Sequence, residues 1–237
     1  MPTTFVIPCY QEADALAAGL GALRALPADE IVFVDDGSTD GTGARLAGAA
    51  AADPRVRVVT HARNQGVGAA MRTGFRAATG DVVVAYDADR TYPGADAARL
   101  IAAVRGGADV ATATPFAPGA EIRATWFRRL LSRAASFAYR LAVGSRARGV
   151  RTFTAGFRAY RGDVVRGLAF RSDGFASTAE ILCLLVLRGA RVVEVPSTLT
   201  ARTEGRSKLR VLPTILGHLR VIARVIDVRL GASVTPP

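Results

Sequence analysis

Residues 82–89 have the sequence VVVAYDAD, an unbroken apolar run that ends in two carboxylates. An apolar run of this length is typical of a strand whose two faces are both covered, as in a parallel sheet. Hard divalent cations take oxygen ligands, and Mg²⁺ commonly binds one or two carboxylates together with substrate phosphates. Asp87 and Asp89 are therefore predicted metal ligands, although Asp-x-Asp by itself also fits a simple turn.

The same pattern continues on both sides of this stretch. Short β-type runs alternate with Ala- and Leu-rich segments, and Gly, Pro, Asn and Asp fall at the joints. The alternation predicts an α/β fold with an open, mostly parallel sheet flanked by helices. The predicted strands are Thr3–Pro8, Ile31–Val34, Val56–Thr60, Val82–Tyr86 and Val110–Ala113, and the predicted helices are 12–25, 40–52, 67–79 and 95–105.

Ligands of open parallel sheets bind beyond the carboxyl ends of the strands. That edge is predicted to gather three segments: 8–12, 35–38 and 87–89. Asp35 and Asp36 are placed to accept hydrogen bonds from a nucleobase or ribose, whereas Asp40 is predicted to cap the helix that follows it. Four converging carboxylates repel one another, so we expect a metal or another cation among them.

The second half of the chain is less regular. From Leu212 to Ile226 the apolar residues follow i, i+3, i+4 spacing, with arginines largely outside that stripe. This predicts a basic amphipathic C-terminal helix that packs on the sheet or lies in a membrane interface. We expect a single domain, 1–209, followed by an amphipathic helix and tail, 210–237. Further predictions are a helix over Glu121–Val143, a strand over Thr154–Tyr160, a helix over Phe175–Arg188, a strand over Arg191–Pro196 and a loop over Thr200–Leu209.

Charge is unevenly distributed along the 237 residues. Residues 1–119 hold 10 Arg and 13 Asp or Glu, a net charge of −3, whereas residues 120–237 hold 20 Arg, one Lys and 7 Asp or Glu, a net charge of +14. The basic half suggests contact with phosphate or an anionic membrane surface, although an arginine-rich composition is part of the cause. Cys9 and Cys183 lie in apolar surroundings and are expected to be buried free thiols. Free thiols favour a location in the cytoplasm, and the basic second half favours the inner face of a membrane within it.

Several other functions are disfavoured by the motifs. The chain contains no G-x-x-x-x-G-K-[ST] loop, and Gly66-Val67-Gly68 lacks the third glycine of a dinucleotide fingerprint. His61 and His218 are isolated, which argues against a zinc site or a Ser/His/Asp hydrolase. Aromatic residues make up only 7% of the chain and no reading helix is evident, so nucleic-acid binding is not expected.

The chain resembles glycosyltransferase family 2, which has the GT-A fold, and within it the dolichyl- or polyprenyl-phosphate mannose (or glucose) synthases. The early blocks of the sequence resemble the broad family, and the later blocks resemble the polyprenyl-phosphate branch. The matching segments are IPCYQEAD, VDDGSTDGT, RNQGVGAAMRTG, DADRTYP, WFRRLLSR, TAGFRAYR, GFASTAEILCLLVLRGARVVEVP and ARTEGRSKL.

The resemblance implies roles for individual residues. The nucleotide sugar, a GDP- or UDP-sugar, would contact Pro8, Tyr10, Glu12, Asp35, Asp36 and Asp87. Mg²⁺ or Mn²⁺ would bind Asp87 and Asp89. The acceptor phosphate would contact Arg128, Arg129, Ser132 and Arg133. Catalysis is expected to depend on Asp87, Asp89, Arg128, Arg133, Arg202 and Lys208, with arginine suited to phosphate by its rigid fork of donors. The chain departs from the family at Arg90-Thr91, where a Leu-Gln pair is usual, and at Thr152, where an Asp is common.

The predicted reaction is metal-dependent transfer of a sugar, with inversion, to a polyprenyl phosphate. Two alternatives remain at this level. The first is a soluble family 2 transferase that acts on a hydroxyl group and uses Asp173 or Glu180 as general base. The second is a protein of the same fold that binds nucleotide or membrane without catalysis, since a fold does not establish activity.

Overall fold

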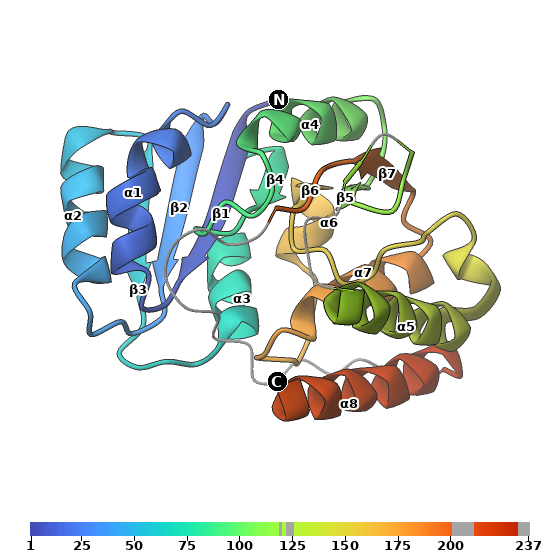
Figure 1. The fold of residues 1–237 in the computed structure, drawn as a ribbon. Coiled ribbons are helices and arrows are strands. Elements are labelled where there is room, and N and C mark those ends of the chain that lie inside the picture. The colour runs from blue at the N-terminus through green and yellow to red at the C-terminus, as the bar shows by residue number, and fades with distance from the viewer. Residues whose placement is uncertain (119, 122–125, 201–210, 232–237) are drawn as a thin grey trace.

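The computed structural model describes residues 1–118, 120–121, 126–200 and 211–231. Its centre is a seven-stranded sheet in the order β3-β2-β1-β4-β6-β5-β7, and helices cover both faces (Figure 1). The strands are β1 (Thr3–Cys9), β2 (Glu30–Asp35), β3 (Val56–Thr60), β4 (Val82–Ala85), β5 (Val110–Thr114), β6 (Arg158–Arg161) and β7 (Val192–Pro196). The predicted α/β class and mostly parallel sheet are confirmed.

The first half of the chain builds the parallel part of the sheet. β1 pairs in parallel with β2 on one side and with β4 on the other, and Cys9 lies opposite Asp35 in the register. Alternate β1 residues enter different cores. Phe5 and Ile7 pack with α1 (Ala13–Arg24), α2 (Thr42–Ala52) and α4 (Ala97–Arg105), whereas Val6 packs with α3 (Val67–Ala77) on the opposite face.

The second half of the sheet is mixed, which the sequence pattern did not reveal. β6 runs antiparallel to both β4 and β5, and β7 is parallel to β5. β6 spans only Arg158–Arg161, so the strand predicted over Thr154–Tyr160 begins later than expected and ends one residue further on. The short helix α6 (Gly162–Arg166) follows it directly and was not predicted.

Three longer helices complete this half: α5 (Trp126–Val143), α7 (Ser177–Leu187) and α8 (Val211–Arg229). α7 is buried along nearly its whole length because it packs with both α5 and α8, which explains its continuous apolar sequence. α8 lies beside α5 (Figure 1) and packs on α5 and α7 through the buried residues Val221 and Val225. The division of the chain at residue 209 stays a prediction.

Cys9 and Cys183 are buried free thiols, as expected. Within the described part of the chain, no helix combines the length and the apolar character needed to span a bilayer.

Candidate active site

The carboxyl ends of β1 and β2 are locked together by hydrogen bonds. The backbone N–H of Gln11, a residue with φ +53°, donates to Oγ of Ser38 at 3.0 Å. The backbone N–H of Glu12 donates to Oγ1 of Thr42 at 2.8 Å, and the Asp40 carboxylate accepts a bond from the first backbone N–H of α1 at 3.0 Å. Asp40 also accepts from the backbone N–H of Thr42 at 3.0 Å, although the N-cap position of α2 itself is Gly41. These two strand ends therefore form one continuous wall.

The predicted nucleoside-binding residues lie on or behind this wall. Pro8 and Tyr10 are half-buried, whereas Glu12, Asp35 and Asp36 are buried. Oδ1 of Asp35 accepts a hydrogen bond from the backbone N–H of Ser38 at 3.1 Å, so this buried carboxylate also has a structural contact. The roles of these residues toward a nucleotide stay a prediction.

Asp36 shows that structural role most clearly. It is 2% exposed, and Oδ1 accepts from Nδ1 of His61 at 2.7 Å and from the backbone N–H of Gln65 at 2.9 Å. Oδ2 accepts from the backbone N–H of Gly66 at 2.8 Å. Since a carboxylate only accepts, His61 carries its proton on Nδ1 in this contact. Nε2 of His61 lies 2.9 Å from Oγ1 of Thr73. Asp36 therefore anchors the segment that leads into α3.

The second group of carboxylates lies at the end of β4. Asp87 and Asp89 are half-buried, in a turn closed by hydrogen bonds from the backbone N–H of Arg90 to O of Asp87 (3.1 Å) and from the backbone N–H of Thr91 to Oδ1 of Asp89 (3.2 Å). Gly156 lies against this turn, and a Cβ at that position would stand 3.1 Å from Oδ2 of Asp87. The glycine therefore leaves space beside the Asp87 carboxylate.

An aromatic group packs behind Asp87. The hydroxyl of Tyr86 donates to the carbonyl of Tyr92 at 2.5 Å, and the ring of Phe157 lies 4.9 Å from that of Tyr86 and 5.7 Å from that of Tyr92. Burial raises the pKa of both tyrosine hydroxyls far above the ordinary value, and the negative charge of Asp87 raises it further. Asp87 thus sets a negative potential at the end of β4, which favours a cation.

The two carboxylate groups do not converge as expected. Among the described residues, no group of three or more His, Cys, Asp or Glu side chains is arranged to hold a metal ion. β2 and β4 are separated by β1, which puts them about 9.5 Å apart at the usual strand spacing. The expectation of four converging carboxylates is therefore wrong. Two carboxylates at the end of β4 still fit a divalent cation that completes its shell with substrate phosphates.

Arg90 occupies the position where family members usually have the first residue of a Leu-Gln pair. Its backbone is in the left-handed region (φ +52°), and its side chain lies across α1 at Gly19. A Cβ on Gly19 would clash with Nε of Arg90, and this buried Nε has no hydrogen-bond partner within the described structure. The turn at the end of β4 is thus joined to α1, a contact that no sequence pattern signalled.

The residues predicted to bind the acceptor phosphate lie on α5. Oγ of Ser132 is 2.7 Å from Oγ1 of Thr154, two residues before Gly156, so α5 is joined to the segment beside Asp87. Arg129 is exposed, and the guanidinium of Arg133 lies over the ring of Phe116, 5.2 Å from its centroid. The side chain of Arg128, and the whole of Arg202 and Lys208, lie outside the described residues.

Glu180 is misplaced for the general-base role considered as an alternative. It is fully buried, and its carboxylate accepts from the backbone N–H groups of Arg171 (3.2 Å) and Ser172 (2.8 Å) and pairs with Arg224 of α8 at 2.6 Å. Burial opposes ionisation, but the bonds from Ser172 and Arg224 outweigh it and lower the pKa of Glu180. The residue is therefore a buried, ionised anchor.

Asp173, the other candidate base, is 59% exposed and forms an ion pair with Arg72 of α3. Its carbonyl accepts from the backbone N–H of Gly68 at 2.6 Å. Arg72 also lies over the ring of Phe170, 5.1 Å from its centroid. The segment that contains Asp173 is thus held against the start of α3.

Arg158, in the block that resembles the polyprenyl-phosphate branch, is also structural. It is fully buried, and its guanidinium donates to Oγ1 of Thr112 (3.0 Å), O of Phe153 (2.7 Å) and O of Thr178 (2.5 Å). A hydrophobic-pattern analysis has no signal for a buried arginine. The neutral acceptors come from separate segments of the chain.

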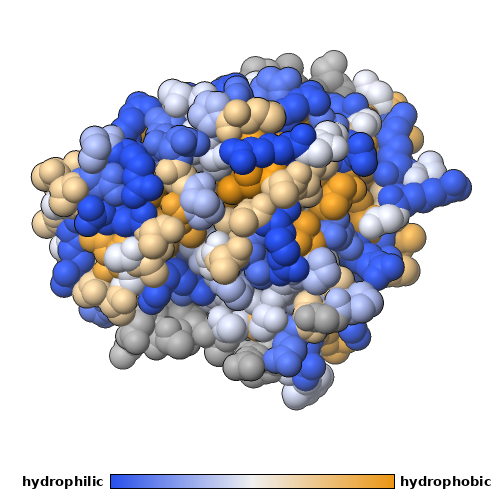
Figure 2. Space-filling view, turned by 90° about the horizontal axis from the view of Figure 1, so that it is seen from above, coloured by the Kyte–Doolittle hydropathy of each residue, from blue (hydrophilic) through white to orange (hydrophobic). Residues whose placement is uncertain are grey.

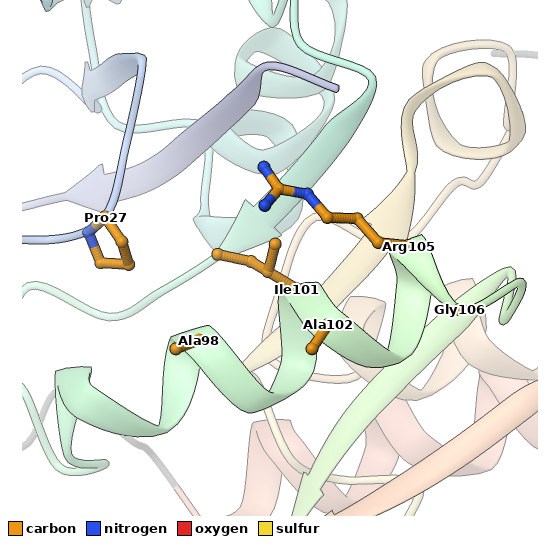
Figure 3. A pocket seen from close by; sticks show the side chains of 6 residues that line it. All are labelled: Pro27, Ala98, Ile101, Ala102, Arg105 and Gly106. Atoms are coloured by element: carbon orange, nitrogen blue, oxygen red, sulfur yellow. The ribbon is translucent and has the colours of Figure 1, made fainter.

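A separate hollow of about 470 Å³ lies at the other end of the sheet (Figure 3). It is lined by Pro27 and by Ala98, Ile101, Ala102, Arg105 and Gly106, and the side chain of Ile101 points toward Pro27. Nη2 of Arg105 donates to O of Met1 at 2.8 Å, so the hollow adjoins the amino end of β1. Its lining offers no carboxylate and includes neither Asp87 nor Asp89.

The family is decided by comparison with known proteins. Residues 4–168 match the model of the glycosyl transferase family 2. The chain belongs to glycosyl transferase family 2. The matched part runs from β1 past β6 and α6, and so contains both carboxylate groups and Gly156. The protein is thus a glycosyltransferase.

Two curated relatives narrow the position of this glycosyltransferase within family 2. It is 37% identical over 216 residues to a polyprenol monophosphomannose synthase of Mycolicibacterium smegmatis, covering 87% of this chain and 80% of the relative. It is 36% identical over 213 residues to an undecaprenyl-phosphate mannosyltransferase of Micrococcus luteus, covering 86% of each.

A solved structure confirms the fold of the transferase. The glucosyl-3-phosphoglycerate synthase of Mycobacterium tuberculosis, bound to Mn²⁺, UDP and glucosyl-3-phosphoglycerate, superposes with a TM-score of 0.70 over 98% of this chain and 81% of that one. Sequence identity is 19%, so the likeness concerns the fold alone. The GT-A-like fold predicted from the sequence is confirmed.

Proposed function

We propose that this transferase moves a sugar, mannose in the first instance, from a nucleotide-sugar donor to a polyprenyl phosphate, with inversion at the anomeric carbon. The observation that carries the proposal is the contact between Ser132 and Thr154. It joins α5, the helix with the predicted acceptor residues, to the segment that lies against Asp87. The sugar and acceptor classes are those named for the two relatives that share 36–37% of its sequence.

The donor is proposed to lie along the edge of the sheet from β2 to β4. The nucleoside contacts the wall at the ends of β1 and β2, through Pro8, Tyr10, Glu12, Asp35 and Asp36. The diphosphate reaches Asp87 and Asp89, and a separation of about 9.5 Å between β2 and β4 suits a nucleoside diphosphate in an extended form. The nucleobase is guanine or uracil.

Asp87 and Asp89 are proposed to hold Mg²⁺ or Mn²⁺ on the diphosphate, with substrate oxygens completing the coordination. When bound, the metal stabilises negative charge on the departing nucleoside diphosphate. Asp87 and Asp89 fix its position, and the aromatic group behind them excludes water from one side. Gly156 leaves room for the phosphates beside Asp87.

The acceptor needs no base from the protein. A phosphate monoester carries a charge of about −1.5 to −2 near pH 7, so its oxygen attacks the anomeric carbon directly. Arg128, Arg129, Ser132 and Arg133, with Arg202 and Lys208, are proposed to bind and orient phosphate. Thr200, the last described residue before these two, donates from its backbone N–H to O of Thr91 at 2.9 Å, which brings the chain beside Asp89. The buried and paired state of Glu180 agrees with a reaction that lacks a protein base.

The proposal is tested by release of nucleoside diphosphate from GDP-mannose, UDP-glucose and dTDP-glucose. Each donor is assayed with Mg²⁺, with Mn²⁺ and with chelator, in the presence and absence of a short polyprenyl phosphate. Asp89→Ala is compared with Asp81→Ala, which removes an exposed carboxylate near the opposite end of the same strand. We expect lipid-dependent release from one donor, lost in Asp89→Ala and retained in Asp81→Ala. Release that ignores the lipid and responds to hydroxyl acceptors would overturn the acceptor assignment.

A further inference from the structure

Large hydrophobic side chains are exposed mainly on two neighbouring helices. The described residues contain eleven exposed side chains of this kind, and nine of them belong to α5, to α8 or to the residue after α8. The residues of this group, which we call the α5–α8 face, are Trp126, Leu130, Phe137, Leu141, Leu212, Ile215, Leu216, Leu219 and Leu230. Trp126 is 70% exposed and Leu212 is 67% exposed. Large apolar side chains that are exposed together on neighbouring helices are typical of an interaction site.

The exposed residues form one stripe on each helix. At 100° per residue, Trp126, Leu130, Phe137 and Leu141 fall within about 60° of one another around α5. On α8, Leu212, Leu216 and Leu219 fall on the side opposite Val221 and Val225, the residues that pack on the protein. The first part of the apolar stripe predicted from the sequence, from Leu212 to Leu219, is therefore on the outer side of α8, whereas Ile222 and Ile226 pack against the core. Packing within the described part of the chain does not account for the four large hydrophobic residues exposed there.

The positive charge of the α5–α8 face indicates an anionic partner. Arg129, Arg133 and Arg140 of α5 and Arg220 of α8 are exposed, α5 contains no acidic residue, and α8 contains only Asp227. Two copies of this surface placed against each other would oppose arginines to arginines, which is unfavourable. A bilayer of anionic phospholipids meets both requirements, because it takes apolar side chains at the acyl boundary and attracts arginines at the headgroups.

The opposite side of the molecule lacks this character. α4 lies at the top of Figure 1 and α8 at the bottom. Viewed from above, over α4, a group of hydrophobic residues lies near the centre, bordered and partly covered by hydrophilic ones (Figure 2). Among the described residues, none of the exposed large hydrophobic side chains belongs to α4. The exposed large hydrophobic side chains thus gather mainly on one side of the protein, as contact with a surface requires.

We propose that the α5–α8 face docks onto the surface of an anionic phospholipid bilayer. α5 presents Trp126 and Leu130 to the lipid, and its Ser132 contacts Thr154 beside the site of Asp87. A phosphate group at the bilayer surface would therefore be separated from the site of Asp87 by only the width of α5. The inference extends the proposed function, which requires access to a lipid phosphate, but docking itself needs no polyprenyl phosphate.

The test uses the only tryptophan of the chain, Trp126, as its reporter. The full-length protein is mixed with vesicles of phosphatidylcholine alone or with 30% phosphatidylglycerol, without polyprenyl phosphate or nucleotide. We expect flotation with the anionic vesicles, a blue shift of Trp126 emission and quenching by brominated acyl chains. Binding that is equal on both vesicle types, absent from both, or unaccompanied by a shift and quenching of Trp126 emission would overturn the proposal.

Matched variants locate the contact. Leu216→Asp combined with Leu219→Asp changes two exposed residues, and Ala47→Asp changes an exposed residue of α2 as control. We expect at least a tenfold fall in partitioning for the double variant and no change for the control.

The arginine of the face is tested in the same way. Arg140→Gln should lower partitioning into anionic vesicles about fivefold, whereas Arg45→Gln, on α2, should leave it unchanged. Equal effects in each matched pair, or loss of a dimer in sedimentation velocity as the only effect of the double variant, would refute docking. If vesicle binding holds while no sugar is transferred, the proposed function fails and the docking surface stands.

Discussion

The carboxylates after β2 and after β4 look alike in the sequence but have different surroundings. Asp36 is buried, and both its oxygens accept hydrogen bonds from the segment that leads into α3. Asp87 and Asp89 are half-buried in a turn beside Gly156. Asp36 therefore holds the segment that leads into α3, whereas Asp87 and Asp89 are proposed to hold a metal on a diphosphate. We infer that these similar strand ends have different roles, structural at Asp36 and chemical at Asp87 and Asp89.

Removing a carboxylate after β4 should give the largest effect. For Asp87→Asn we expect kcat/KM to fall about 1000-fold, because one of two metal ligands is lost. The free energy of unfolding should change by less than about 0.5 kcal/mol, as is usual for substitutions outside the core. Donor turnover and urea denaturation measure the two quantities. A large loss of stability with residual activity in proportion to the folded fraction would contradict the division of roles.

At the end of β2, removing a carboxylate is expected to reduce the stability of the protein. Asp36→Ala leaves His61 and two backbone N–H groups without their acceptor and should lower the free energy of unfolding by about 3 kcal/mol. Urea denaturation measures the loss, and Asp14→Ala, at an exposed carboxylate, serves as control. If Asp36→Ala were as stable as the parent protein but inactive, Asp36 would belong with Asp87 and Asp89.

The sequence indicated where these carboxylates lie but not the structural contacts of Asp36. Strand ends and carboxylates are local features, so β1 to β5 and the placing of Asp35, Asp36, Asp87 and Asp89 at one edge could be predicted. The partners of Asp36 lie 25 to 30 residues further along the chain. Such pairing depends on the tertiary structure, as do the antiparallel direction of β6 and the burial of Arg158. A linear pattern of apolar residues does not encode them.

The pair of Glu180 and Arg224 extends the structural role to the second half of the chain. Glu180→Gln should lower the free energy of unfolding by about 2 kcal/mol near pH 7, since it leaves Arg224 without its anionic partner. The folded-state pKa of Glu180 is lowered, so its contribution is present above the unfolded value of about 4.5 and is lost as pH falls through the folded value. Urea denaturation from pH 7 to pH 3 should show a difference between parent and variant that shrinks below pH 4.5. A constant difference would exclude the ionised pair as its source.

The contact between Arg90 and Gly19 should give the smallest effects, and it joins the two strand ends through α1. A Cβ on Gly19 would displace Arg90, so Gly19→Ala should lower the free energy of unfolding by about 1 kcal/mol. Gly21 of the same helix has nothing within 4 Å of such a Cβ, and Gly21→Ala should raise the free energy of unfolding by about 0.7 kcal/mol through helix propensity. Because the Arg90 backbone closes the turn of Asp87, Gly19→Ala should also reduce donor turnover a few-fold, while Gly21→Ala leaves it unchanged. Equal turnover in the two variants would show that the turn after β4, which is proposed to bind the metal, does not depend on α1. The strand ends of β2 and β4 would then act independently of each other.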